Sequence, residues 1–463
     1  MQGGGHYWRV TQKPTAAEQI DTRPLTRNQK SLIGLTIAGN ICEFFDLFLI
    51  GFVIALLMRT PGWDLTGLQA GIIAASSGVG TVLGSLVWGR MADHFGRRHA
   101  FMWCIVVMVA FTAATLTIQP GQWHLLSLYR VGVCVGVGGL NITSLPFVQE
   151  FVPARQRGLL AGLTSVFIPL GLFLGSLATK LFAEPFGWKG LIALGCTPIV
   201  ILLWGYSVPE SPRFLATRGK YDAARDAYAW AMQIPHKQVG TVEVPPAKEK
   251  TSYALIVRKY PRELVIIAAA SFCFLLGCFT IQSWGQTLLG ESFNFDTGTV
   301  VYMFMGVSAV DLAGRLLGAW MSDRIGRRRT LLIWGWLGGT GCLIAAFSAK
   351  AADSGMVSTH AAGLIFFGGI LLAMTFGDGS FGFLNAFGAE QFPAAARSTG
   401  VGMTYGIGAT AKIMGPYLVG WMIGSSKLTP QIVFIPFLLF GILLFVGGFL
   451  FTRARETAGV ALD

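Results

Sequence analysis

Long runs of apolar residues follow one another along almost the whole chain, separated by short polar segments. A run of about 20 apolar residues is long enough for a helix to cross the hydrocarbon core of a bilayer. We therefore predict an all-α integral membrane protein of twelve transmembrane helices, at residues 32–58, 68–90, 99–118, 123–149, 158–182, 187–207, 262–289, 298–321, 329–349, 360–388, 397–424 and 430–452.

A basic turn occurs twice at equivalent places in this pattern. Residues 89–98 read GRMADHFGRR and residues 319–328 read AWMSDRIGRR, so that Asp93 is repeated 230 residues later as Asp323. A second echo, with Glu, Pro and Arg in the same order, follows the fourth span at Glu150 and the tenth at Glu390. Repeats of this length indicate two similar halves, an arrangement typical of secondary transporters.

The repeat predicts a domain organisation in which two pseudo-symmetric six-helix bundles are joined by a charged linker. The linker favours a short helix over Tyr221–Met232, which is rich in alanine. The expected segments are a cytoplasmic tail at 1–31, a bundle at 32–207, the cytoplasmic linker at 208–261, a second bundle at 262–452 and a cytoplasmic tail at 453–463.

The chain has a net charge of +12, and the distribution of its basic residues predicts the orientation. If the N-terminus is cytoplasmic, 27 of the 35 Lys and Arg residues lie on the cytoplasmic side, five lie opposite and three lie within spans. This asymmetry predicts that both termini are cytoplasmic in a plasma membrane, or in the inner membrane of a bacterium. The basic residues are therefore expected to contact lipid head groups and not nucleic acid.

Reactive groups are sparse in this sequence. All seven cysteines fall inside predicted spans and the six histidines are scattered, so we expect no disulfide framework, no metal site and no cofactor. Nothing resembles a nucleophile–base pair or a phosphate-binding loop, so no catalytic residue is assigned and the protein is not expected to be an enzyme.

Four blocks of sequence together resemble the major facilitator superfamily. They are the basic turn at 89–98, the glycine-rich stretch 130–139, the block VPESPR at 208–213, and Glu390 to Arg397 with Phe392-Pro393 between them. The resemblance covers nearly the whole chain and points to the sugar-porter and organic-acid symporter branches. It implies two bundles that rock around a central site.

The seventh span favours one of these two branches. Residues 282–289 read QSWGQTLL, which lacks the paired tyrosines of sugar porters and is similar to the Trp-x-Pro-Thr-x-Leu pattern of aromatic-acid:proton symporters, with Gln286 in place of proline. The drug-antiporter pattern is missing at 169–171. The resemblance therefore favours import of an organic acid.

Ionisable side chains inside a span need a partner, a cavity or a function, because each costs about 3 kcal/mol on insertion scales. Asp46 lies about 20 Å along the first span from Leu32, near the middle of the bilayer, and Glu43 shares its helix face. Two such carboxylates favour binding of a proton by one of them. Asp46 is predicted to couple protons and Arg130 to be its partner, while for Glu43 coupling and a structural role remain equally open. The resemblance implies the same role for Asp46.

Other charges are expected in the second half. Asp311 and Arg315, four residues apart, are predicted to form a structural pair. Lys412 is predicted to hold a substrate carboxylate, with pairing to Asp378 as the alternative. Asp378 is itself a candidate substrate-binding residue beside the cavity, and a second proton site and mere packing accommodation remain equally open for it. Trp284 and its polar neighbours Gln282 and Gln286 are also predicted to bind the substrate, and Trp284 is the aromatic residue most expected to stack on a ring.

The basic turns are expected to form a gate at the cytoplasmic side that closes when the protein faces outward. The predicted gate residues are Asp93, Arg97, Glu150, Arg157, Asp323, Arg327, Glu390 and Arg397. An alternative is that the arginines only fix topology.

These features combine in one functional hypothesis. The chain is predicted to be a secondary active transporter that imports a small organic carboxylate with protons by alternating access, with aromatic acids favoured. It is expected to work as a monomer whose partners are this substrate, protons and membrane lipid. The alternatives are a sugar or polyol symporter on the same fold and, as a different class, a nutrient sensor that does not transport.

Overall fold

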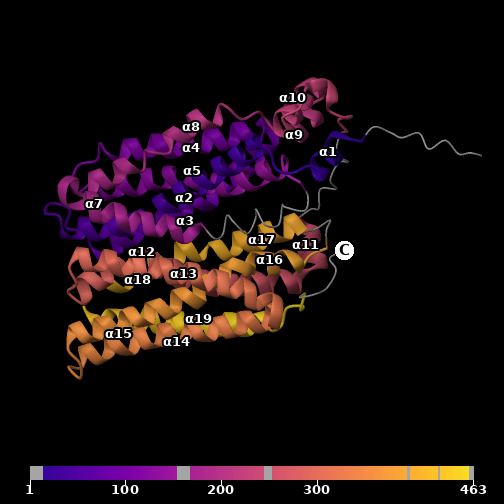
Figure 1. The fold of residues 1–463 in the computed structure, drawn as a ribbon. Coiled ribbons are helices and arrows are strands. Elements are labelled where there is room, and N and C mark those ends of the chain that lie inside the picture. The colour runs from indigo at the N-terminus through magenta and orange to yellow at the C-terminus, as the bar shows by residue number, and fades with distance from the viewer. Residues whose placement is uncertain (1–13, 154–166, 244–252, 394–396, 426–427, 458–463) are drawn as a thin grey trace, which may run out of the picture.

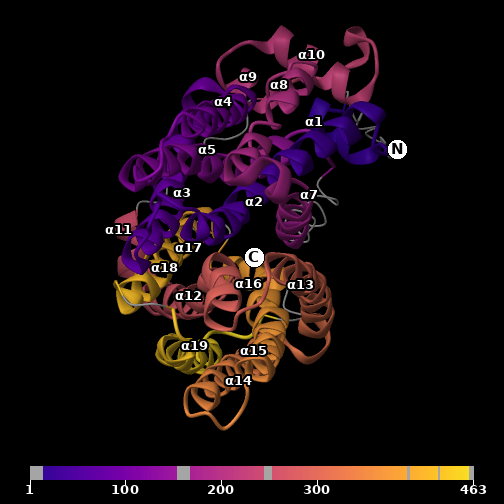
Figure 2. The same ribbon diagram turned by 90° about the vertical axis from the view of Figure 1, so that its left-hand side faces the viewer.

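The computed structural model describes residues 14–153, 167–243, 253–393, 397–425 and 428–457, and every regular element within these ranges is helical. The helices form two bundles that lie side by side (Figure 1). Viewed end-on, helices from the first part of the chain occupy one bundle and helices from the last part the other (Figure 2).

The N-terminal bundle contains one helix that must be counted as two spans. α7 has a non-helical residue, Gly187, and its two limbs return to the same neighbour: Gly171 packs on Phe44, and Gly195 packs on Asp46. Residues 24 apart on a straight helix would be about 36 Å apart, so the chain reverses at Gly187. The helices of this bundle are α2 (Arg27–Arg59), α3 (Gly67–Phe95), α4 (Arg97–Thr115), α5 (Trp123–Gln149), α7 (Ile168–Leu194) and α8 (Ile199–Gly205).

The C-terminal bundle contains two interrupted spans. One runs from α15 to α16 through a π turn and a 3₁₀ turn, and the other consists of α17 followed by α18. The elements are α12 (Pro261–Ser292), α13 (Thr297–Ile325), α14 (Arg327–Asp353), α15 (Thr359–Leu372), η3 (Ala373–Gly377), η4 (Asp378–Ser380), α16 (Phe381–Glu390), α17 (Arg397–Ala409), α18 (Ala411–Ile423) and α19 (Pro430–Phe451).

The described residues agree with the predicted fold class of two six-helix bundles. Within the part of the chain that the structure describes, ten helical stretches are long and apolar enough to cross a membrane when 168–205 is counted once. Dividing that stretch at Gly187 and adding α17 with α18 gives the predicted twelve spans.

The first described helix, α1, and the last described residues, after α19, lie at the same end of the bundles, which we call the termini face; the opposite end is the far face (Figure 1). The short helices at the termini face are α1 (Ala16–Thr22), α9 (Pro212–Thr217), α10 (Tyr221–Met232), η2 (His236–Gln238) and α11 (Tyr253–Lys259). α10 is the helix that the alanine-rich linker sequence predicts. It is anchored on the first span, where the Thr26 hydroxyl donates to the Ala231 carbonyl at 2.5 Å.

Glycines bring the helices of the first bundle into close contact. A Cβ at Gly84 of α3 would lie 2.1 Å from the Val135 carbonyl oxygen of α5. In the same way, a Cβ at Gly138 of α5 would lie 2.2 Å from the Thr81 carbonyl oxygen of α3. Only glycine fits at these two positions. This small-residue packing is a common way for helices to associate within a membrane, and it holds α5, with its buried Arg130, against α3.

Candidate functional site

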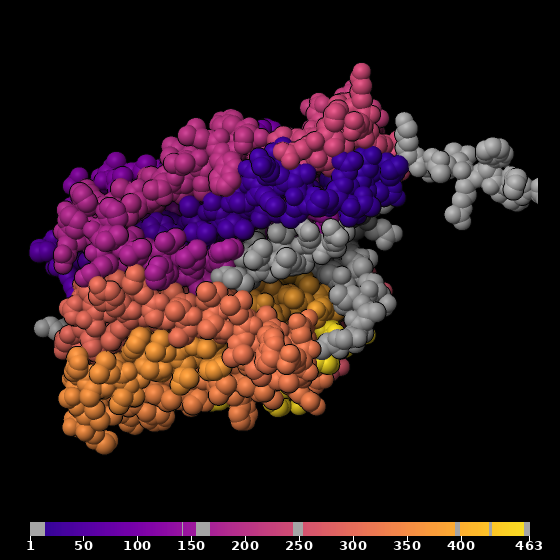
Figure 3. All heavy atoms as spheres, in the orientation of Figure 1, coloured from indigo at the N-terminus to yellow at the C-terminus, as the bar shows by residue number. Residues whose placement is uncertain are grey.

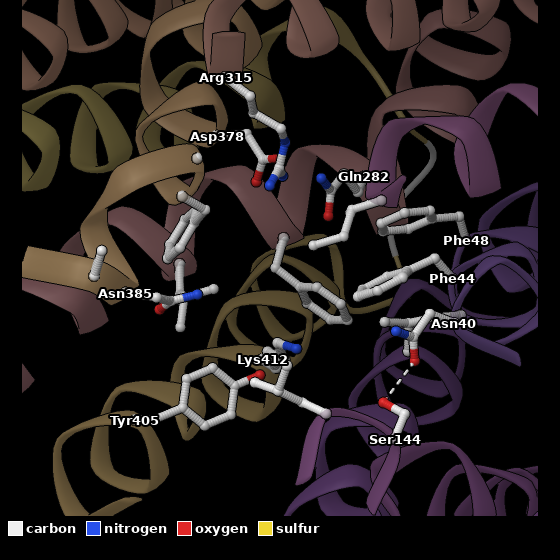
Figure 4. Close-up of a pocket in the computed structure, with 18 of the residues that line it drawn as sticks. Asn40, Phe44, Phe48, Ser144, Gln282, Arg315, Asp378, Asn385, Tyr405 and Lys412 are labelled. Atoms are coloured by element: carbon white, nitrogen blue, oxygen red, sulfur yellow. Dashed lines mark hydrogen bonds and ion pairs between the residues drawn. The ribbon is translucent and has the colours of Figure 1, made fainter. Parts of the chain in front are cut away.

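A cavity of about 400 Å³ lies between the two bundles. Its walls come from α2, α5 and α7 of one bundle and from α12, α13, η4, α16, α17 and α18 of the other. The aromatic part of the lining is Phe44, Phe48, Phe279, Phe381 and Tyr405, and the polar and charged part is Asn40, Ser144, Gln282, Arg315, Asp378, Asn385 and Lys412. Arg315 and Asp378 lie at one side of the cavity, with Lys412 and Tyr405 opposite (Figure 4).

The bundles are joined at the far face. A Cβ at Gly71 of α3 would lie 2.8 Å from the Gly420 Cα of α18, and Arg59 of α2 forms an ion pair with Glu291 of α12. Figure 3 shows the two halves meeting along this seam. The cavity instead reaches Ala389, one residue before α16 ends at the termini face. It therefore extends toward the termini face and is closed toward the far face.

Gly71→Ala is expected to open the seam at the far face. The added methyl meets backbone, which cannot turn away, and overpacking of this kind costs about 1–3 kcal/mol. A penalty confined to the closed arrangement shifts the population toward one with the bundles apart. The rate at which a water-soluble maleimide labels Gln286→Cys, buried at the far face, should rise about tenfold.

Gly89→Ala is the matched control for this prediction. It adds a methyl to the same helix, but the nearest atom, on Ile142, would be 3.8 Å away, an ordinary contact. Labelling should remain at the rate of the parent Gln286→Cys protein. An equal rate in the Gly71→Ala protein would show that the seam does not depend on this close approach.

Lys412 is a buried cation that faces the cavity. Its side chain is 7% exposed, and its ammonium makes no ion pair with any described residue. The nitrogen lies 5.5 Å from the centre of the Phe279 ring and 5.9 Å from that of Tyr405, within the range of cation–π attraction. The alternative pairing with Asp378 is not formed, because Asp378 is bound by Arg315.

Asp46 and Arg130 form the contact predicted from their depths. An Arg130 Nη donates to Asp46 Oδ2 at 2.7 Å, the other Nη donates to the Asp46 carbonyl at 2.9 Å, and Nε donates to the Ser77 hydroxyl at 2.9 Å. Both side chains are buried. A cavity of about 20 Å³ touches the pair, and Leu47, next to Asp46, lines the central cavity. Glu43 is also buried, on the same helix.

Arg315 has a different place from the one predicted. It pairs with Asp311 at 3.0 Å as expected, but it also binds Asp378 on η4 and lines the cavity. The self-contained Asp311–Arg315 pair is therefore corrected to a triad of two carboxylates and one guanidinium. The i, i+4 spacing shows only the partner on the same helix, whereas Asp378 approaches from another span.

Two predicted substrate residues lie away from the cavity. The Trp284 indole donates to the Pro416 carbonyl at 3.2 Å and is buried between α12 and α18. Gln286 shares the helix face of Gln282 but lies one turn farther on, where Gly51 packs against it in the closed seam. Of the other residues predicted to bind substrate, only Gln282 and Asp378 line the cavity together with Lys412.

Sequence reasoning missed three polar residues of the lining. Asn40 and Ser144 face the cavity from the first bundle, with the Ser144 hydroxyl donating to the Asn40 amide oxygen at 3.2 Å, and Asn385 faces it from α16 (Figure 4). The available signal was the two asparagines inside otherwise apolar spans, because a buried amide needs polar partners. The described residues hold no group of three or more metal-ligating side chains.

The predicted gate residues form two separate clusters, one in each half. Arg97 binds Asp93 at 2.8 Å and Glu150 at 3.5 Å, while Arg327 binds Asp323 at 2.7 Å and Glu390 at 3.3 Å. Among the described residues no ion pair joins the clusters across the termini face. Arg157 lies outside the described residues, and of Arg397 only the backbone, at the start of α17, is described.

The basic turns need glycine for two reasons. Gly96 and Gly326 have φ of +107° and +99°, and their Cβ atoms would meet the carboxylates of Glu210 and Glu456. These carboxylates accept from the backbone N–H groups that begin the following helices, at 3.0 Å for both Arg98 and Arg327. Glycine therefore recurs at positions 96 and 326 because the turn needs a positive φ and because a carboxylate occupies the space beside the N-terminus of the following helix.

Hydroxyls complete the two clusters in the same way. Ser211 donates to Glu150 in the first half, and Thr457 donates to Glu390 in the second. Burial raises the pKa of Glu150, although the Ser211 hydroxyl and the Arg97 guanidinium act in the opposite direction. The pseudo-symmetry of the sequence therefore extends to the side-chain contacts at the termini face.

Comparison with known proteins agrees with this architecture. Residues 32–463 match the family described as sugar (and other) transporter. The chain is similar to the niacin transporter NiaP of Acinetobacter baylyi (27% identity, covering 96% of this chain and 98% of the relative) and to a gallate transporter of Pseudomonas putida (27%, covering 87% of each).

The fold is shared with a solved sugar transporter. The xylose transporter XylE from E. coli, in a partially occluded inward open conformation, superposes with a TM-score of 0.69 at 19% identity, covering 94% of this chain and all of that one. The family match spans nearly the whole chain, and the helices, seam and cavity are those of a multi-pass carrier. The chain therefore belongs to the sugar (and other) transporter family of the major facilitator superfamily, and it is a membrane transporter of small molecules, not an enzyme.

Proposed function

We propose that this transporter imports a small aromatic carboxylate together with protons. The observation that supports this most is Lys412, a buried ammonium without an ion-pair partner among the described residues, at a cavity whose walls carry five aromatic rings. A buried cation is stable when an anion joins it. A planar carboxylate would neutralise Lys412 while its ring stacks on Phe44, Phe48 or Tyr405. Relatives named for niacin and gallate are consistent with this ligand class.

Proton coupling is assigned to Asp46 and Arg130. When Asp46 takes a proton, its attraction to the guanidinium weakens and Arg130 becomes free to change partners. Because α2 and α5 both line the central cavity, a change in their contact alters the walls around the substrate. Protonation and reorientation of the bundles would then depend on each other.

The orientation follows from charge. The basic turns lie at the termini face, which we assign to the cytoplasm of a plasma membrane or bacterial inner membrane. The cavity then extends inward in this structure, and the two gate clusters are apart. In the outward-facing state they would meet across the termini face in the same monomer.

A sugar or polyol is the second candidate substrate. It is favoured by the amides of Asn40, Gln282 and Asn385 in the lining, since such groups hydrogen-bond hydroxyls, and by the fold shared with a xylose transporter.

A ligand-dependent thermal shift of the purified protein tests the proposal. Niacin and gallate are compared with their neutral amides and with xylose and glucose, all at the same concentration. A ligand at 100 times its dissociation constant stabilises the folded protein by about 2.7 kcal/mol, and a weaker ligand at that concentration stabilises it less. We expect a larger shift with the carboxylates than with their amides. A shift with a sugar alone would move the transporter to the second candidate.

A further inference from the structure

The tenth span is interrupted beside the cavity. α15 gives way to the π turn η3 and the 3₁₀ turn η4 before α16 begins. Interruptions of this kind within a helix mark functional sites, and within a membrane they occur where the backbone lies against protein or a cavity. Asp378 is the first residue of η4, and its carboxylate faces Arg315 of α13 (Figure 4).

The triad around Arg315 carries one negative charge too many. Its guanidinium binds both Asp311 and Asp378, and the exposed fractions of the three side chains are 1% for Asp311, 2% for Arg315 and 6% for Asp378. Two carboxylates and one guanidinium leave a net charge of −1 in the middle of a span. An uncompensated charge in such a place is strongly unfavourable.

One oxygen of the triad lacks a hydrogen-bond donor. Asp311 Oδ2 is buried and has no partner among the described residues, while the Asp311 carboxyl is within hydrogen-bonding reach of the Asp378 carboxyl. Two ionised carboxylates only repel at that range, but one bound proton turns the contact into an O–H···O hydrogen bond and removes the excess charge.

Nothing else described near the triad supplies the missing charge. The other titratable groups beside it are the thiols of Cys278 on α12 and Cys342 on α14, both buried. Lys412 lies at the opposite side of the cavity and pairs with neither carboxylate (Figure 4). Because Asp378 and Arg315 line the cavity, a proton can reach the triad from there.

We propose that Asp311 and Asp378 bind one shared proton beside Arg315, and that this triad is a second proton site of the transporter. The proton adds to a carboxylate oxygen and no bond is broken elsewhere. The inference rests on the proposed function, in which Asp46 carries the first proton. Two protons moving with a singly charged carboxylate carry one net positive charge inward, so import would also be driven by the membrane potential.

Infrared spectroscopy of the purified protein tests the shared proton without any substrate. In a difference spectrum between neutral and alkaline pH, the wild type should show the carbonyl band of a protonated carboxyl. Asp311→Asn and Asp378→Asn should each lose about one carboxyl of that band, because either change leaves a neutral Asp–Arg pair. The control Asp353→Asn, exposed at the end of α14, should keep it. A full band in both the Asp311→Asn and the Asp378→Asn protein would overturn the proposal.

Transport in proteoliposomes gives a test that needs only the wild type if the variants fail to fold. With equal pH on both sides, a tenfold potassium gradient and valinomycin should raise accumulation of labelled niacin or gallate about tenfold, since one net charge moves with each molecule. Asp378→Asn should lose this response and still accumulate on a pH gradient.

The outcomes separate the two proposals. A wild type that accumulates substrate on a pH gradient but ignores the potassium gradient carries a single proton, which overturns the second site and leaves the proposed function intact. A wild type that responds to neither gradient with either acid contradicts the proposed function itself, and the infrared band then decides the fate of the shared proton independently.

Discussion

Asp46→Asn is expected to abolish accumulation of substrate above its external concentration while exchange of internal for external substrate continues. Asparagine keeps the size and hydrogen-bonding capacity of the side chain at the 2.7 Å contact with Arg130, but it cannot take up or release a proton. Exchange needs no net proton movement, because the loaded carrier returns loaded. Counterflow and pH-driven uptake of labelled niacin or gallate in proteoliposomes measure the two activities separately.

Two further variants sharpen this test. Glu43→Gln changes the other carboxylate of the same helix face, and it decides between its two open roles: loss of accumulation with exchange intact would make it a coupling residue. Asp64→Asn, on the exposed turn before α3, is the control and should behave as wild type. Accumulation at the wild-type level in the Asp46→Asn protein would rule out Asp46 as the coupling site.

Lys412→Gln is expected to weaken binding of an aromatic carboxylate by about tenfold to a hundredfold. A hydrogen bond to a charged group contributes about 1.5–3 kcal/mol, and each 1.4 kcal/mol is a factor of ten in affinity. The thermal shift or isothermal titration of niacin measures the loss. Nicotinamide, which has the same ring without the charge, should bind the wild type and the variant alike.

Lys412→Arg provides the matched comparison. It restores a cation in the same part of the cavity, near the Phe279 and Tyr405 rings, and is expected to recover most of the affinity for the acid. If Lys412→Gln weakens niacin and nicotinamide equally, the lysine shapes the cavity without recognising the carboxylate, and it would no longer belong to the substrate site.

The ion pair of Asp46 with Arg130 could be predicted because depth alone selects it. One side chain lies about 20 Å from one membrane surface and the other about 10 Å from the opposite surface, which puts both at the same level of a core about 30 Å thick. Few other charges lie at that level in the first half, so the position of each residue along its own span was enough to predict the pair.

The partner of Asp378 could not be obtained in this way. Lys412 and Arg315 are both intramembrane cations of the same half, and depth does not choose between them. The choice depends on how α13 and α18 are rotated about their axes and on the irregular turns η3 and η4 that aim Asp378 at Arg315. Rotation is set by packing with neighbouring helices, which a single hydrophobic pattern does not contain.

The sequence by itself determined the membrane class, the two-fold repeat and the twelve spans, because a bilayer of fixed thickness imposes a length on each apolar run and a charge bias on each end. Only the tertiary structure decided which polar side chains share the cavity, that Trp284 and Gln286 are excluded from it, and that Arg315 holds two carboxylates. These outcomes depend on contacts between helices that are distant in the chain. A side chain one helical turn farther along, or on another face of the same helix, lies in the closed seam and not in the cavity wall.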